Sequence, residues 1–313
     1  MELSRSRLGG GGQGAAARPH LGQPRRGGRR ARGPRPARRA RLGAAVRPCA
    51  GAGAVRAVSG RAASAVRLAL TGARATITLD RPEKLNALSV ADLEDFATAL
   101  GQVHAASEAR VLVVTGTGAR AFSSGVSLGD VAGADWSDNP LTALCDGLEQ
   151  FPLPTICALN GGVWGGGAEI ALACDFRIGV EGMVCAVPPA RLGIHYEPGG
   201  IARAMRKLGA QTARRLFLAA EQFDDKALLA LGFVDRLVAP QALAAAVDAL
   251  ADRIAGLAPL AVQGMKRTIV ELAENRLDGE AARARIAQAW ASADLREGLA
   301  AMKEKRAPQF RGE

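Results

Sequence analysis

A glycine-rich stretch between two apolar segments, Asn160 to Asp175, constrains this chain more than any other feature. The apolar run from Thr155 to Leu159 predicts a buried strand before it, and the small residues from Ala168 to Cys174 predict a helix after it. Glycines 165 to 167 therefore fall at a strand-to-helix junction, where the first amides of the helix lack an intrahelical acceptor and carry the positive end of its dipole. Because glycine has no side chain, a ligand oxygen can reach these amides. We expect this junction to stabilise an oxygen that develops negative charge.

Glu169 follows Gly166 by three residues, which places both on one face of the predicted helix, one turn apart. A carboxylate that can move a proton thus lies beside an amide that can hold an oxyanion. Two interpretations of Glu169 stay open: a catalytic acid or base, and a first-turn carboxylate that the helix dipole favours.

The first 65 residues differ in composition from the rest of the chain. They contain fifteen Arg and one acidic residue, Glu2, whereas the whole 313-residue chain has a formal net charge of +11. This segment consists almost entirely of Gly, Ala, Arg and Pro, which cannot bury enough apolar surface to offset chain entropy, so we predict disorder. Three interpretations remain: a tail that binds nucleic acid through phosphate, an organellar transit peptide, and a start assigned too far upstream.

Cysteine and histidine usage predicts a reducing compartment and no metal centre. The five cysteines form no C-x-x-C pair, and the three histidines are scattered. No apolar run reaches the roughly 18 residues needed to span a membrane. We therefore expect a cytoplasmic protein with no membrane partner, organellar only if the extension is a transit peptide.

The remaining chain alternates predicted strands and helices, which favours an α/β core. Ser89 is a good N-cap for a helix from about Val90 to His104. Pro198 suits the first turn of a helix that ends near Gly209. The other expected elements are a hairpin of 66–70 with 75–79, strands at 110–115, 176–180 and 184–187, a helix at 141–151, and amphipathic helices at 259–274 and 278–303. We expect the last two to pack on a neighbouring subunit or fold back on the core.

Five motifs together resemble the enoyl-CoA hydratase/isomerase, or crotonase, superfamily over about residues 66 to 310. They are Arg81-Pro82 with Asn86-Ala87-Leu88, the segment 122–128 (FSSGVSL), the glycine-rich stretch, 189–194 (PARLGI) and 305–310 (KRAPQF). The resemblance implies a crotonase-like spiral of β-β-α turns at 66–255, a helical trimerisation region at 256–313, homotrimers or homohexamers, and acyl-CoA substrates. It implies no cofactor apart from the coenzyme A of the substrate.

In that family two backbone amides grip the thioester oxygen, and here they match Val126 and Gly166. Family hydratases place two glutamates around one water. Glu169 matches the first, but Pro189 stands at the second position and cannot move protons. Glu197 falls close to the position of the catalytic water. Tyr196 has the spacing of a tyrosine in decarboxylases that resemble methylmalonyl-CoA decarboxylase; each could instead be structural.

Further residues match substrate contacts of the family. Lys84 is near a phosphate-contacting lysine, Phe310 lies in a C-terminal segment that touches coenzyme A, and Trp164 lines the acyl site or belongs to the core. Ser124, Gly125 and Leu128 flank the first amide. We therefore expect hydration of a 2-enoyl-CoA. The alternatives are double-bond isomerisation, acyl-CoA decarboxylation, binding of acyl-CoA without catalysis, and, less favoured, nucleic-acid binding through the Arg-rich extension.

Overall fold

The computed structural model describes residues 55–57, 64–127, 129–130 and 138–313. All of them belong to one compact unit, Val46–Glu313, and the other unit, Met1–Ala45, lies outside the described ranges. The predictions for Leu128 and for most of the extension therefore fall outside the described residues. One strand, β1 (Val55–Ala57), lies within the predicted extension and pairs with the strand after it.

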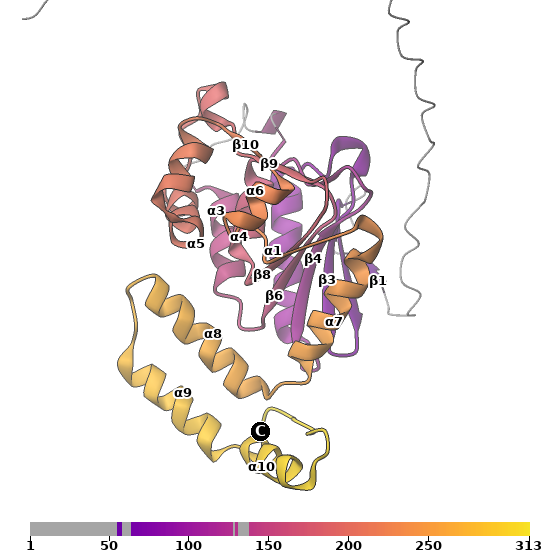
Figure 1. The fold of residues 1–313 in the computed structure, drawn as a ribbon, viewed down its shortest axis with the longest axis vertical. Coiled ribbons are helices and arrows are strands. Elements are labelled where there is room, and N and C mark those ends of the chain that lie inside the picture. The colour runs from indigo at the N-terminus through magenta and orange to yellow at the C-terminus, as the bar shows by residue number, and fades with distance from the viewer. Residues whose placement is uncertain (1–54, 58–63, 128, 131–137) are drawn as a thin grey trace, which may run out of the picture. The chain divides into compact units, whose positions relative to one another are not determined.

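A seven-stranded sheet forms the centre of the molecule (Figure 1). Its order is β1, β2 (Val66–Thr71), β3 (Arg74–Leu79), β4 (Val111–Gly116), β6 (Thr155–Leu159), β8 (Phe176–Val180) and β11 (Arg236–Val238). The first three strands are antiparallel, which confirms the predicted hairpin, and the later pairs are all parallel. β4 and β6 are apolar runs because helices cover both faces of the parallel part.

A second, four-stranded sheet stands beside the first. Its order is β10 (Gln222–Asp224), β9 (Val184–Ala186), β7 (Gly162–Trp164) and β5 (Ala121–Ser123). Each of β5, β7 and β9 directly follows a strand of the large sheet, and a helix then leads to the next turn. This repetition is the β-β-α spiral that the resemblance implied.

Alternate residues of the central strands face two different apolar layers. Leu112 and Val114 of β4 join the main core with α1 (Val90–Ala105), α3 (Pro140–Glu149), α4 (Gly166–Ala173) and α5 (Pro198–Phe217). Val111 and Val113 face the other way, against α7 (Leu243–Ala255), which follows the short α6 (Asp225–Ala230). The described residues also include three 3-10 turns: Pro82–Lys84, Pro189–Leu192 and Pro240–Ala242.

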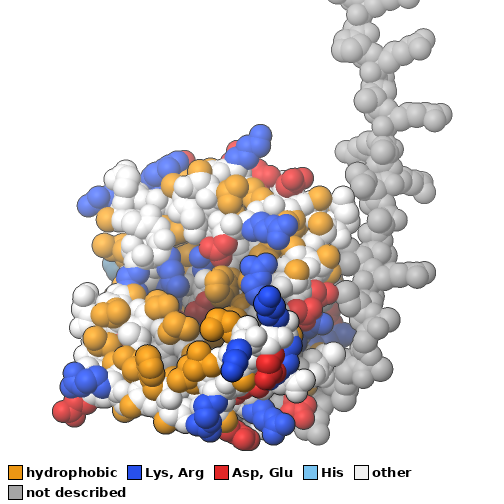
Figure 2. Space-filling view, turned by 60° about the horizontal axis from the view of Figure 1, so that its bottom comes forward, with side chains coloured by type: hydrophobic (Ala, Val, Ile, Leu, Met, Phe, Trp, Pro, Cys, Tyr) orange, Lys and Arg blue, Asp and Glu red, His pale blue; other side chains and the backbone are white. Residues whose placement is uncertain are grey.

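The C-terminal region consists of α8 (Pro259–Ala273), α9 (Gly279–Ala291) and α10 (Ala293–Glu304). The prediction of one helix at 278–303 is wrong, because Ser292 is extended, with ψ 155°, and its hydroxyl caps α10 by accepting from the Leu295 amide. Figure 2 shows hydrophobic side chains gathered on the face that these helices occupy. The exposed apolar residues there are Met265, Ile269, Leu272, Leu277, Ile286, Trp290, Leu299 and Met302.

The helix from Pro198 is interrupted at Gly209, as predicted, because this residue has non-helical angles of φ 82° and ψ 157°; a second helical segment then continues α5 to Phe217. The short strands β5, β7, β10 and β11 were not predicted, because three residues are too few to show periodicity. Among the described residues, no helix combines the length and apolar character needed to cross a membrane.

Candidate active site

The glycine-rich stretch forms the β7–α4 junction, as the sequence predicted. Gly165 has φ 51° and ψ −123°, and its amide donates to the Ala186 carbonyl of β9 at 3.0 Å, which anchors the turn. Gly166 is the first residue of α4, so its amide lies among those that have no intrahelical acceptor. The helix begins two residues before the predicted Ala168.

A second glycine turn lies directly against this junction. The Leu88 amide donates to the Gly125 carbonyl at 2.9 Å, and the Ser127 amide donates to the Leu88 carbonyl at 2.8 Å. Val126 lies between Gly125 and Ser127, the two residues that bond to Leu88. In a parallel bridge of this kind, the N–H of Val126 points away from Leu88. Gly125 has φ +85°, and a Cβ on it would lie 2.6 Å from the Gly166 nitrogen. The chain segments that carry the Val126 and Gly166 amides are therefore adjacent.

Buried polar side chains hold the Gly125 turn in place. Asn86 is 1% exposed, and its amide nitrogen donates to the carbonyls of Thr117 at 3.0 Å and Ala121 at 2.9 Å. The Ser123 hydroxyl donates to the Asn86 carbonyl and accepts from the Gly125 amide. Asn86 was part of the sequence motif without a stated role, and the structure places it as a support for this loop.

One cavity of about 820 Å³ brings most of the predicted residues together. Its lining includes Ser124, Val126, Trp164, Gly166, Glu169, Pro189, His195, Tyr196 and Glu197, with apolar walls from Leu141, Leu192 and Ile194. Lys84 is exposed in its 3-10 turn, and Phe310 packs near Gly298 of α10; neither is among the described residues that line this cavity.

Both oxygens of Glu169 are hydrogen-bonded. Oε2 accepts from the Tyr196 hydroxyl at 2.8 Å, and Oε1 accepts from Nη1 of Arg203 at 2.8 Å. Burial raises the pKa of Glu169 above its ordinary value, although the hydrogen bond from Tyr196 and the charge of Arg203 oppose the increase. Burial and the neighbouring Glu169 charge also raise the pKa of Tyr196, so the hydroxyl keeps its proton at neutral pH.

Sequence reasoning missed Arg203, which is 1% exposed. Besides Glu169, it donates from Nε to Glu149 at 2.9 Å and from Nη2 to Asp146 at 2.5 Å. Burial alone would lower the pKa of Arg203, but the acidic groups around it raise it above its usual range. The sequence of α5 offers no signal that separates Arg203 from the helix's four other basic residues.

Glu197 and Pro189 occupy other parts of the same wall. Glu197 is the N-cap residue of α5 but makes no side-chain capping bond, so its carboxylate is not committed to the helix. Pro189 is buried at the start of its 3-10 turn and contributes only hydrocarbon to the cavity. Nδ1 of His195 lies 2.8 Å from the Tyr196 carbonyl, and the described residues include no cluster of three metal-ligating side chains.

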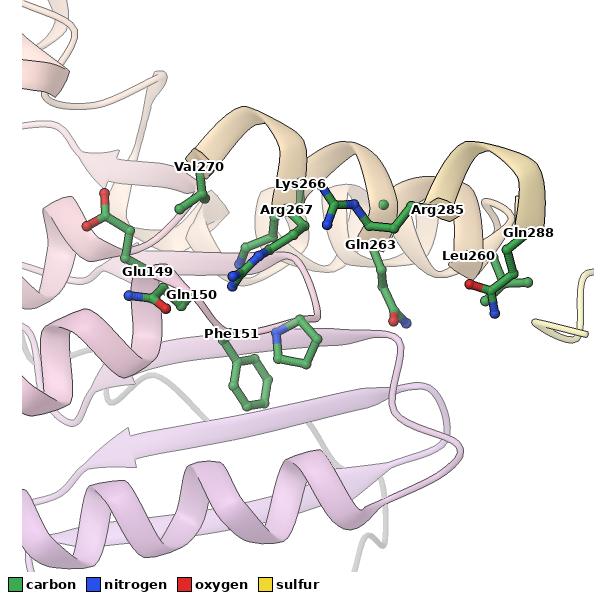
Figure 3. A pocket seen from close by; sticks show the side chains of 12 residues that line it. Glu149, Gln150, Phe151, Leu260, Gln263, Lys266, Arg267, Val270, Arg285 and Gln288 are labelled. Atoms are coloured by element: carbon green, nitrogen blue, oxygen red, sulfur yellow. The ribbon is translucent and has the colours of Figure 1, made fainter. Parts of the chain in front are cut away.

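A second cavity of about 260 Å³ lies between the end of α3 and helices α8 and α9 (Figure 3). Three cationic side chains line it, and each is paired. Lys266 donates to the Leu153 carbonyl at 2.9 Å, while Arg267 and Arg285 both contact the Glu271 carboxylate. Lys266 also pairs with Asp175 at 2.6 Å, so each of the three cations already has a carboxylate partner within the protein, and we assign this cavity to the packing between the core and the C-terminal helices.

The spiral of β-β-α turns, with adjacent glycine turns beside a buried carboxylate, defines a crotonase-type acyl-CoA enzyme. Comparison with known proteins agrees. The family model described as enoyl-CoA hydratase/isomerase matches residues 71–313. The chain belongs to the enoyl-CoA hydratase/isomerase family and is an acyl-CoA enzyme of that family.

Individual relatives match most of the chain. It is 33% identical over 238 residues to the probable enoyl-CoA hydratase echA6 of Mycobacterium bovis, which covers 76% of this chain and 95% of that protein. It is 30% identical over 203 residues to the short-chain-enoyl-CoA hydratase of Clostridium acetobutylicum, covering 63% and 78%. A solved enoyl-CoA hydratase from Bacillus anthracis superposes with a TM-score of 0.71 at 30% identity, over 79% of this chain and 99% of that one.

Proposed function

We propose that this enzyme adds water to the double bond of a 2-enoyl-CoA. The thioester oxygen would lie between the Val126 and Gly166 amides, which stabilise the enolate as water adds to the β-carbon. The observation that carries this proposal is the close contact between the Gly125 turn and the Gly166 amide, with Glu169 one helical turn away. Removing one donor of such a site typically lowers the rate ~10²- to 10³-fold.

Glu169 would serve as the acid/base group. As a carboxylate it would accept a proton from the attacking water, and it would then return a proton to the α-carbon, which regenerates the carboxylate. Its raised pKa suits this exchange, because the best acid/base groups titrate near the working pH. Pro189 offers no proton, so Glu197, the other carboxylate on the cavity wall, is the candidate second group.

Pro189 also favours a second candidate, a shift of the double bond in a 3-enoyl-CoA. That reaction moves one proton from the α-carbon to the γ-carbon, so a single base, Glu169 or Glu197, is sufficient. Decarboxylation of a malonyl-type thioester would use the same oxyanion site, with Tyr196 near the departing carboxylate.

The test is to incubate purified protein with crotonyl-CoA, a 3-enoyl-CoA and methylmalonyl-CoA while products are followed by chromatography. Formation of 3-hydroxyacyl-CoA from crotonyl-CoA would support hydration, and Glu169→Gln should slow it by ~10²- to 10⁴-fold. Glu181→Gln, at an exposed carboxylate outside the cavity lining, is the matched control and should leave the rate unchanged. Turnover of only the other two substrates would refute the hydratase proposal.

We also propose that the chain assembles into homotrimers or homohexamers through the exposed apolar faces of α8 to α10. The large apolar side chains exposed on these helices, which include Trp290 at 74% and Met302 at 72% exposure, are unfavourable in a monomer. In such an assembly Phe310 and Lys84 could reach a coenzyme A moiety. Light scattering on a size-exclusion column tests this, and a monomer at micromolar concentration would contradict it.

Coenzyme A would enter only as part of the substrate, with no separate cofactor or metal. Full activity after exhaustive dialysis against a chelator is the expected result. A cytoplasmic location stays a prediction, which fluorescence microscopy of the tagged full-length chain would test.

A further inference from the structure

Arg203 contacts three carboxylates that come from two different helices. Its Nη1 reaches Glu169 of α4, whereas Nε and Nη2 reach Glu149 and Asp146 of α3. Arg203 and Glu169 are both nearly inaccessible, with side chains 1% and 3% exposed, but Asp146 is 51% exposed. The contact with Glu169 is therefore the one that water competes with least.

Burial without a cation would favour the protonated form of Glu169. A fixed guanidinium 2.8 Å from Oε1 counteracts this, and it binds that oxygen on the side away from Tyr196. Nε and Nη2 are held by Glu149 and Asp146 of α3, so Nη1 approaches Oε1 of Glu169 from a fixed direction. Oε2 is the oxygen that Arg203 does not bind; it accepts from the Tyr196 hydroxyl, and both Tyr196 and Glu169 line the cavity.

We infer that Arg203 is a positioning residue: it keeps Glu169 ionised and holds its orientation while Oε2 accepts from Tyr196. The inference rests on the proposed acid/base role of Glu169. Arg203 does not line the described cavity wall, so it acts through the carboxylate.

Other charged and titratable groups also face Glu169. α3 contributes Asp146, Glu149 and the buried thiol of Cys145, and the cavity wall contributes Tyr196, His195 and Glu197. Arg206, one helical turn beyond Arg203, contacts Glu149 at 2.9 Å and Glu274, the C-cap residue of α8, at 3.6 Å. It shares a partner with Arg203 and has no described contact with Glu169, so it provides a matched control.

The experiment measures the protonation of Glu169 directly in the full chain. Infrared difference spectra are recorded against pH for the wild type, Arg203→Gln, Arg203→Lys and Arg206→Gln, and the carboxyl band is assigned by its loss in Glu169→Gln. In Arg203→Gln we expect the pKa of Glu169 to rise by about one unit or more, with ~10-fold less carboxylate at a given pH below it. Arg203→Lys should partly restore the wild-type titration, and Arg206→Gln should leave it unchanged.

The same variants are then compared by the pH dependence of kcat/KM with crotonyl-CoA. In Arg203→Gln the acid limb of the kcat/KM profile should move to higher pH, together with the infrared titration. An unchanged titration in Arg203→Gln, or an equal shift in Arg206→Gln, would overturn the inference. If Arg203→Gln does not fold, Arg203→Met, which also removes the charge but keeps more of the side-chain volume, takes its place, and an unshifted titration in Arg203→Met overturns the inference. The infrared result needs no turnover, so it stands apart from any failure of the hydratase proposal.

Discussion

Gly200 lies so close to Glu169 that a Cβ atom at this position would be 2.8 Å from Oε2 and 2.5 Å from Cε1 of Tyr196. A Cβ atom does not approach non-bonded atoms this closely, so Gly200→Ala must displace Tyr196 or the carboxylate. Because a shift of about 1 Å can cost ~10²-fold in rate, we expect kcat to fall by that order while acyl-CoA affinity changes little. Steady-state kinetics and calorimetric binding of butyryl-CoA test this.

Gly199→Ala is the control for that variant. A Cβ there would first meet Cγ2 of Thr142 at 3.3 Å, which a small adjustment relieves, and it touches neither Glu169 nor Tyr196. Equal losses in the two variants would show that disturbance of α5, rather than of the Tyr196–Glu169 pair, lowers the rate.

Gly125 is the second position where a single methyl group should abolish most activity. Its Cβ would lie 2.6 Å from the Gly166 nitrogen, and its φ of +85° disfavours any other residue. Gly125→Ala should therefore separate the two amides and reduce kcat by ~10²- to 10³-fold. Gly101→Ala in α1, whose Cβ would meet no atom within 4 Å and which does not line the cavity, should keep its activity, and near-equal melting temperatures would exclude global unfolding.

The pH dependence of the reaction follows from the raised pKa of Glu169. A base must be ionised, so kcat/KM should fall as pH drops through a value above the ordinary carboxyl range. The hydrogen bond from Tyr196 favours the carboxylate, hence Tyr196→Phe should raise that pKa further and move the acid limb to higher pH. In the Glu169→Gln variant, this fall of kcat/KM at low pH should disappear. A downward movement in Tyr196→Phe would contradict the assignment of the limb to Glu169.

Asp92 should contribute stability that acid removes. Its buried carboxylate forms a reciprocal capping box with Ser89 and pairs with Arg81 at 2.6 Å. Burial opposes its ionisation, but the hydrogen bonds from Arg81, Ser89 and Ala65 together hold the pKa of Asp92 below its ordinary value. A depressed pKa means that the stabilisation is present above the unfolded value and is lost as pH falls through the folded one.

Asp92→Asn is therefore expected to lower the free energy of unfolding by about 1–3 kcal/mol at neutral pH, with the difference shrinking as pH falls below the ordinary pKa of an aspartate. Urea unfolding at several pH values measures it. Glu94→Gln, an exposed carboxylate on the same helix, should change the free energy by less than about 0.5 kcal/mol. A difference that stays constant with pH would contradict the ionisation argument.

Local signals predicted the elements of the core well. Ser89 is the N-cap of α1, Thr155–Leu159 is β6 without adjustment, and the glycine turn opens α4 beside Glu169. These features depend on residues close in sequence, where hydrogen bonding and apolar periodicity act directly.

Features that depend on distant contacts were not predictable. Arg203 is buried because α3 supplies Glu149 and Asp146 from more than fifty residues away, and no property of α5 alone indicates that. Likewise Ser292 ends one helix and caps the next, although the apolar pattern of 278–303 continues across it. Gly209 was identified as a break, but the helix resumes after it.

The Gly166 amide and the Glu169 carboxylate sit on a single turn of α4, and every residue of that helix is buried. Three residues of helix span about 4.5 Å along the axis, so the helical backbone fixes the distance between these two groups, and no side-chain substitution changes it. The choice of substrate must therefore depend on the other residues that line the cavity, such as Trp164, Leu192 and Ile194. Substitutions at those positions can change which acyl chains are accepted, while the distance between the Gly166 amide and the Glu169 carboxylate stays the same.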